Sequence, residues 1–195
     1  FYRANQLYFL TAPSLPDGTS IHDQVLVQGR LRVMEAGGRE VPCARSESGD
    51  VVRCKSSLSS AAMQVTRLRV DKAFSRCIDL SLPPPGAQVE LTLEAPLAPR
   101  VSGLRLGVPD GQRTTAGIGV EIIVDGEAVA TTRLAEGRKG SRWLQFRSPM
   151  ESLVVRAHRQ APESAPQVCL LFGDEEWRSV DAPEELSEAG LERRY

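Results

Sequence analysis

The sequence concentrates positive charge around one tryptophan. Five cations and an indole occur within fifteen residues: Arg133, Arg138, Lys139, Arg142, Trp143 and Arg147. A flat indole offers an apolar face for a sugar ring, and a guanidinium can fork onto a carboxylate or sulfate. We therefore predict that these six residues form a ligand-binding surface for a sugar or an anion. The alternative is that Trp143 is buried and that the loop cations only keep the chain soluble.

Few residues are available for acid and base catalysis. His22 and His158 are the only histidines, and the alternating pattern around His158 is typical of a strand surface. A Ser-His-Asp triad would need His22 with Asp17 or Asp23. The sequence has no Gly-x-Ser-x-Gly motif that would expose a serine nucleophile. We therefore expect no catalytic residues, and a hydrolase is only a distant alternative.

The cysteine spacing predicts disulfides rather than a metal site. Cys43, Cys54, Cys77 and Cys169 include no Cys-x-x-Cys pair, which a zinc ribbon would require. The turn-forming run at 46–50 can bring Cys43 and Cys54 together in a hairpin, so we favour Cys43–Cys54 and Cys77–Cys169 among the three possible pairings. Two disulfides indicate an oxidising compartment. Four reduced thiols in a cytosolic protein are the alternative.

Charge and composition argue against two classes of protein, those that bind nucleic acid through bulk charge and those that span a membrane. The chain has 24 basic and 25 acidic residues and a net charge of -1, which argues against a polybasic nucleic-acid arm. No stretch approaches the roughly 20 apolar residues of a membrane helix. Arginine outnumbers lysine 21 to 3, a bias expected from a GC-rich bacterial genome. The first residue is Phe1, so we expect the chain to come from a longer protein that an upstream segment can anchor.

Strands must position these residues, because apolar and polar residues alternate along most of the chain. We predict strands over 24–33, 65–70, 89–94, 101–108, 119–124, 127–134, 143–147, 153–159 and 168–172. The dipeptide Asp125-Gly126 tolerates positive φ and predicts a tight hairpin turn. Short strands without crossover helices indicate an antiparallel β-sandwich. Helix is expected only near the C-terminus, where Asp181 and Pro183 resemble a helix start.

These elements suggest three regions. Residues 1–76 supply N-terminal strands, either as an extension of the sandwich or as a small module. Residues 77–180 form the core of the sandwich, and residues 181–195 form a C-terminal helix or tail.

From Cys77 onward the pattern resembles the galactose-binding-like jelly roll of discoidin-type domains and carbohydrate-binding modules. The resemblance rests on an apolar-proline stretch before a strand at 98–108, a Val-Asp-Gly turn within 119–127, a Trp-x-x-Phe-x-x-Pro segment at 143–149 and a strand ending in Arg156. It implies an all-β jelly roll that binds ligands with end loops. Many such domains hold calcium, but no loop here gathers three oxygen ligands, so we expect no metal and no cofactor.

Together these observations predict a non-catalytic recognition module, periplasmic or extracellular, that binds a glycan. The alternative is a protein-protein interaction or scaffold domain of a membrane-anchored envelope complex. A glycan-binding module predicts an exposed Trp143 beside arginines, whereas a scaffold domain predicts a buried Trp143 and an apolar patch or sheet edge elsewhere. Neither nucleic acid nor a membrane span within the chain is expected.

Overall fold

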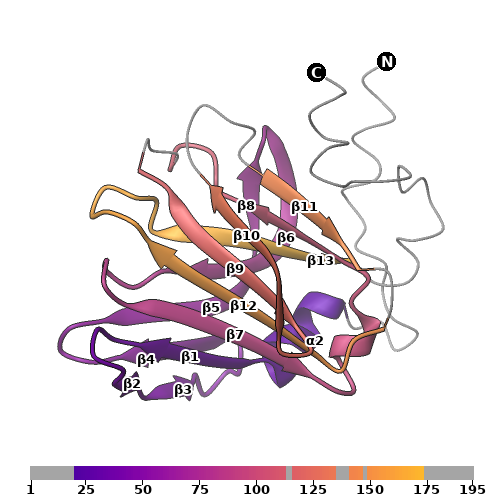
Figure 1. Cartoon of the computed structure of the whole chain (residues 1–195), viewed down its shortest axis with the longest axis horizontal. Coiled ribbons are helices and arrows are strands. Elements are labelled where there is room, and N and C mark those ends of the chain that lie inside the picture. The colour runs from indigo at the N-terminus through magenta and orange to yellow at the C-terminus, as the bar shows by residue number, and fades with distance from the viewer. Residues whose placement is uncertain (1–19, 113–115, 135–140, 147–148, 174–195) are drawn as a thin grey trace.

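The computed structural model describes residues 20–112, 116–134, 141–146 and 149–173, which fold as two stacked antiparallel sheets (Figure 1). The six-stranded sheet has the order β10 (Glu127–Leu134), β9 (Ile118–Val124), β12 (Ser152–Arg159), β7 (Gln88–Glu94), β1 (Arg30–Met34) and β2 (Glu40–Val41). The seven-stranded sheet has the order β11 (Ser141–Gln145), β8 (Gly103–Gly107), β13 (Gln167–Gly173), β6 (Ala73–Ser81), β5 (Ser60–Val70), β4 (Val51–Lys55) and β3 (Cys43–Arg45). The predicted all-β sandwich is confirmed.

The core lies between the sheets. Along β7, Val89, Leu91 and Leu93 are buried while the residues between them are not, as the period of a half-buried strand requires. Residues from both sheets, from the short 3₁₀ turn Ala98–Arg100 and from the N-terminal helix belong to one apolar cluster. Residues 30–70 contribute strands to both sheets, so β1 and β2 share this core with β7 to β13.

The predicted strand at 24–33 is wrong over its first half. Residues Ile21–Gln28 form helix α2, and only Arg30–Met34 form a strand. The buried residues of α2 are Ile21, His22, Val25 and Leu26, which follow a helical spacing, whereas Val27 is 66% exposed. Ser20 caps the helix by accepting a hydrogen bond from the backbone N–H of Asp23. The expectation that helix occurs only near the C-terminus is therefore also wrong.

Gly29 separates α2 from β1. A Cβ at this position would lie 2.5 Å from the carbonyl oxygen of Val25 and 3.0 Å from a methyl carbon of Leu91. Only glycine therefore fits this helix-to-strand junction without displacing its neighbours. The C-terminal helix predicted at 181–195 lies outside the described residues.

The predicted hairpin at Asp125-Gly126 is confirmed. Val124 and Glu127 pair across the turn, and both turn residues have positive φ, as a type I′ turn requires. A second such turn joins β5 and β6 at Asp71 and Lys72, where φ is 51° and 68°. Asp110 holds this turn, because its carboxylate accepts hydrogen bonds from the backbone N–H groups of Asp71 and Lys72 at 3.1 and 2.9 Å.

The end of the β5–β6 hairpin lies against the outer face of its own sheet. Val70 packs in a small buried cluster with Cys77, Cys169 and Leu171, and Asp71 lies within 3.3 Å of Arg105 on β8. Val70 and Asp71 lie at the turn, whereas Cys169 and Leu171 lie on β13 and Arg105 on β8, so the hairpin end bends over these two strands. The strand β6 was not among the predicted strands.

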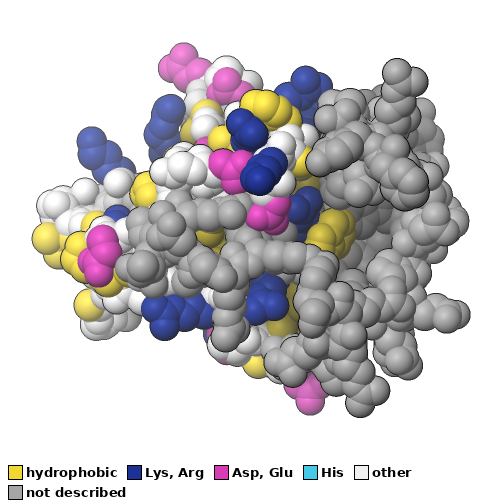
Figure 2. Space-filling view, turned by 90° about the horizontal axis from the view of Figure 1, so that it is seen from above, with side chains coloured by type: hydrophobic (Ala, Val, Ile, Leu, Met, Phe, Trp, Pro, Cys, Tyr) yellow, Lys and Arg dark blue, Asp and Glu magenta, His cyan; other side chains and the backbone are white. Residues whose placement is uncertain are grey.

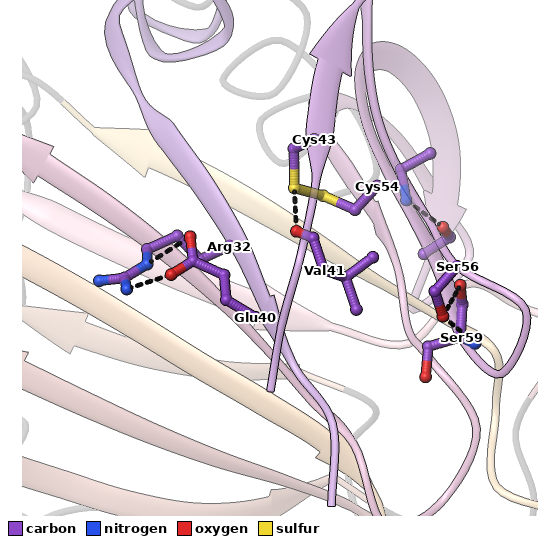
Figure 3. Close-up of a disulfide and its surroundings, with 9 residues drawn as sticks. Arg32, Glu40, Val41, Cys43, Cys54, Ser56 and Ser59 are labelled. Carbon is purple, nitrogen blue, oxygen red and sulfur yellow. Dashed lines mark hydrogen bonds and ion pairs between the residues drawn. A yellow bond between two sulfur atoms is a disulfide. The ribbon is translucent and has the colours of Figure 1, made fainter. Parts of the chain in front are cut away.

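Both predicted disulfides are confirmed. Cys43–Cys54 links two directly opposed residues of β3 and β4. Figure 3 shows it at the corner where the chain passes from β2 to β3, beside the ion pair of Arg32 and Glu40. Cys77–Cys169 joins β6 and β13 across 92 residues of sequence and is fully buried. Among the described residues no helix is long and apolar enough to cross a membrane.

Candidate ligand-binding surface

The structure places three of the six predicted site residues. Arg133 is exposed on β10, and Arg142 and Trp143 are half-buried on β11. Arg138, Lys139 and Arg147 lie outside the described residues. β10 and β11 are edge strands of different sheets. Because β1 contacts β3 and β4 on the opposite side, β10 and β11 both lie on one side of the sandwich.

The three described residues point in different directions. Trp143 pairs with Arg105, which lies on the outer face of the seven-stranded sheet beside Leu171. Arg142 pairs with the core residue Leu106 and therefore points to the opposite face of β11. Arg133 lies on the other sheet, opposite Gly119. The structure thus does not gather them on one sheet face, although it keeps them on one side of the molecule.

Trp143 is held by a buried cation. The guanidinium carbon of Arg105 lies 5.5 Å from the centre of the indole ring, a distance typical of a cation–π contact. Arg105 is only 6% exposed, and burial lowers the pKa of its guanidinium, while Asp71 at 3.3 Å acts in the opposite direction. The ring is therefore held against Arg105 on the outer face of the sheet, and Trp143 as a whole residue is half-buried.

Ion pairs occupy the outer face of the six-stranded sheet. Arg156 on β12 donates hydrogen bonds to Glu90 on β7 at 2.7 Å and to Glu121 on β9 at 3.1 Å. The hydrogen bond to Glu90 is the main reason why the pKa of Arg156 is raised. On the next strands Arg32 pairs with Glu40 at 2.5 Å. These two arginines and three glutamates form a row of paired charges across five strands, with one negative charge in excess.

Beside this row, two glycines make room for larger side chains. A Cβ at Gly117 would overlap the side chain of Arg133, and one at Gly119 would overlap the ring of His158. His158 is exposed on β12, as predicted. The side of the molecule in Figure 2 mixes basic, acidic and hydrophobic side chains, so its described part is not a single block of one charge.

His22 does not have the geometry of a catalytic base. Its ring is buried at 2% exposure, and its Nε2 accepts a hydrogen bond from the backbone N–H of Phe172 at 3.1 Å. Burial, followed by the charge of Arg76, lowers the pKa of His22 to about 4, and Asp23 acts in the opposite direction. The histidine is therefore neutral at physiological pH and serves the packing of α2 on β13. Asp17 lies outside the described residues.

The described residues also contain a buried acid. Asp79 on β6 is 4% exposed and accepts hydrogen bonds from the side-chain amides of Gln64 and Gln167 at 3.1 Å each. Burial raises the pKa of Asp79, and the hydrogen bond from Gln64 opposes the shift. In the part of the chain that the structure describes, no group of three or more His, Cys, Asp or Glu residues is placed to hold a metal ion.

Comparison with known proteins finds similarity only at the level of structure. No protein-family model matches the sequence, and no curated protein sequence matches it. The CBM51 module of Clostridium perfringens GH95, solved with methyl-galactose, is 15% identical with a TM-score of 0.41, and the match covers 73% of this chain and 89% of that one. The tandem CBM51 modules of a family 98 glycoside hydrolase from Streptococcus pneumoniae are 10% identical with a TM-score of 0.39, over 78% and 50%.

A third similar structure is that of CBM51-2 with GlcNAc and the INT domains from Clostridium perfringens ZmpB. It is 13% identical with a TM-score of 0.34, and the match covers 82% of this chain and 35% of that one. The chain is thus similar in structure, at low sequence identity, to galactose-binding-like CBM51 sandwiches, as its motifs predicted. At these values the similarity assigns no ligand to this chain.

Sequence reasoning missed the hairpin end with Phe74 and the role of Arg105. The positive φ of Asp71 and Lys72 has no glycine to signal it, and Arg105 stands in a strand whose other residues are apolar. The helix α2 did have a signal, because Ser20 and Asp23 match the start of a capping box.

Proposed function

We propose that the chain is a non-catalytic recognition module, located outside the cytoplasm, that binds a carbohydrate at the β11 edge around Trp143. The observation that carries this proposal is the half-buried Trp143, whose indole lies against the guanidinium of Arg105. A ring already immobilised by the protein loses little conformational freedom when a sugar stacks on it. The half-buried state of Trp143 lies between the exposed and buried states that the two hypotheses predicted.

The disulfides support the proposed location. Both pairs are formed, and the described cysteines include no free thiol. Disulfides persist in oxidising compartments such as the periplasm and the exterior of the cell. The proposed location is therefore periplasmic or extracellular.

A glycan array tests the proposed ligand class. Wild type, Trp143→Ala and Trp143→Phe are compared, with thermal unfolding to show that all three are folded. We expect the alanine variant to lose about tenfold or more in affinity and the phenylalanine variant to retain most of it, because the stacking face is kept. Identical array profiles for wild type and Trp143→Ala would contradict the proposal.

One observation favours a protein-interaction domain as the second candidate. Val129 on the edge strand β10 is 53% exposed, in a bulge between Ala128 and Ala130. An exposed apolar residue on an open sheet edge can pair with a strand of another chain. This candidate predicts no glycan binding and a decrease in self-association or partner affinity for Val129→Lys, measured by sedimentation.

A further inference from the structure

The end of the β5–β6 hairpin has two unlike faces. One face carries Leu68 and Val70, which pack on the buried disulfide of Cys77 and Cys169. The other face, which we name the basic hairpin face, consists of Arg67, Arg69, Phe74 and Arg76. In the strand register Arg67 lies opposite Arg76, and Arg69 lies opposite Phe74. Since successive residues of a strand alternate in direction, these four side chains share one surface.

The basic hairpin face carries more positive than negative charge. Arg76 pairs with Asp23 of α2 at 2.5 Å, and Arg69 lies 3.5 Å from Asp110. Arg67 is exposed and makes no hydrogen bond or ion pair with any described residue. The three arginines of this face thus meet two carboxylates, which leaves one positive charge in excess, and Lys72 is exposed at the adjoining turn, where Asp71 pairs with Arg105.

The position of Arg67 lowers the stability of the unliganded protein. Like charges directly opposite each other on adjacent strands are destabilising, and Arg67 and Arg76 are such a pair. Asp23 compensates only Arg76. An anion bound across the pair would remove the repulsion.

Phe74 is the aromatic residue of this face. Its ring is 62% exposed, and among the described residues the other large hydrophobic side chains with comparable exposure are aliphatic: Val27, Leu58 and Val129. Phe74 lies on the broad face of the hairpin. The turn itself is tied down by Asp110 and Arg105, so the ring is presented on a fixed surface.

We propose that the basic hairpin face binds an acidic polysaccharide. The ring of Phe74 would stack on the apolar face of a sugar, and the guanidinium groups of Arg67 and Arg69 would fork onto its carboxylate or sulfate groups. An acidic peptide offers partners for the arginines but no flat apolar face for Phe74. The proposal builds on the proposed carbohydrate recognition and assigns an anionic ligand to a second surface, separate from Trp143.

Binding of the full chain to four immobilised polymers tests the proposal: polygalacturonate, dextran sulfate, uncharged dextran and poly-glutamate. We expect binding to the two acidic polysaccharides, none to dextran, and at least about tenfold weaker binding to poly-glutamate. Added salt lowers the affinity because it screens the exposed charges. Equal affinity for poly-glutamate would overturn the assignment to a polysaccharide in favour of an acidic protein.

Three variants locate the site. Phe74→Ala and Arg67→Gln should each lower the affinity for polygalacturonate about tenfold, the usual effect of losing one stacking ring or one charged contact. Arg53→Gln is the matched control, because Arg53 is an exposed arginine on β4 of the same sheet, and it should have no effect. Unchanged affinity in Phe74→Ala and Arg67→Gln, or an equal loss in Arg53→Gln, would overturn the proposal.

Two further measurements separate this proposal from its alternatives. Arg67→Gln should unfold at the same temperature as wild type or at a slightly higher one, because it relieves the repulsion of Arg76. Trp143→Ala should retain binding to polygalacturonate. If Trp143→Ala has no effect on the glycan array but Phe74→Ala abolishes polygalacturonate binding, the proposed β11 site is wrong and the proposed site on the basic hairpin face is supported. If Trp143→Ala loses glycan binding but Phe74→Ala leaves polygalacturonate binding unchanged, only the proposal for the basic hairpin face is wrong.

Discussion

His22 shows how a single residue acquires its properties from distant parts of the chain. Its neutral ring accepts a hydrogen bond from the backbone N–H of Phe172, 150 residues away in sequence, and its Nδ1 atom is buried with no hydrogen-bond partner among the described residues. The sequence supplied the residue type and the neighbouring Asp23, which left a catalytic triad only as a distant alternative. The burial that excludes this role depends on β13, and no local pattern around His22 could reveal it.

The low pKa of His22 makes stability depend on pH. The unfolded chain takes up a proton near pH 6.5, but the native state resists protonation until about pH 4. The free energy of unfolding should therefore be full above pH 6.5 and fall as the pH drops to 4, by up to about 3 kcal/mol. Urea unfolding of wild type and His22→Gln at pH 7.5 and 4.5 tests this. The variant should lose less stability between the two pH values, and equal losses would contradict the assignment.

At the scale of elements, most strands were predictable. Some bury one face, as β7 and β12 do, and others are short apolar runs, as β9 and β13 are. β7, β9, β10, β12 and β13 coincide with predicted strands to within two residues at each end. The helix α2 was not predicted, because Val25, Val27 and Gly29 also fit an alternating pattern. The exposure of Val27 and the close packing at Gly29 depend on the tertiary structure. The helix cap formed by Ser20, in contrast, could have been predicted from the sequence.

Gly29→Ala tests the junction between α2 and β1. The added methyl group would meet the backbone carbonyl oxygen of Val25 and the side chains of Leu91 and Leu93. The oxygen belongs to the backbone and both leucines are buried in the core, so none of the three can move aside easily. We expect the free energy of unfolding to decrease by about 1–3 kcal/mol, measured by urea denaturation. Val27→Ala on the exposed face of α2 serves as the control and should change it little.

Asp110 fixes the turn between β5 and β6. Asp110→Ala removes the acceptor for the N–H groups of Asp71 and Lys72 as well as the partner of Arg69. We expect a loss of about 1–3 kcal/mol and faster hydrogen exchange confined to the turn and its flanking residues. Asp50→Ala, at another exposed turn, is the matched control. Unchanged exchange at the β5–β6 turn would show that Asp110 does not hold it.

At the scale of the whole molecule, the strands before and after residue 76 share the main core between the sheets. We propose that the described residues unfold as one cooperative unit, because β1 pairs with β7 and β2 extends the same sheet, while β3 to β6 join the other sheet. The sequence located the change of pattern near residue 76 but left open whether the first part is a separate module. Whether the first part is a separate module depends on pairing between strands that are distant in sequence, and the periodicity of a sequence does not predict such pairing.

The two disulfides should differ in accessibility and in their contribution to stability. Cys43 is half-buried on an edge strand, whereas Cys77 and Cys169 are fully buried. Dithiothreitol without denaturant should therefore reduce Cys43–Cys54 first, as followed by alkylation and mass spectrometry. Replacing both cysteines by serine should cost about 3 kcal/mol for Cys43–Cys54 and about 5 kcal/mol for Cys77–Cys169, because the second closes a much longer loop. Reduction in the opposite order would contradict this prediction.

The bent hairpin also constrains how the protein matures. Val70 covers the sulfur pair of Cys77 and Cys169 in the finished molecule, so an oxidising enzyme can reach those thiols only while the hairpin end is still open. Oxidation after the hairpin has closed would thus leave these thiols behind a closed cover, and refolding of the reduced chain should link Cys77 and Cys169 more completely when the oxidant is present from the start than when it is added after folding.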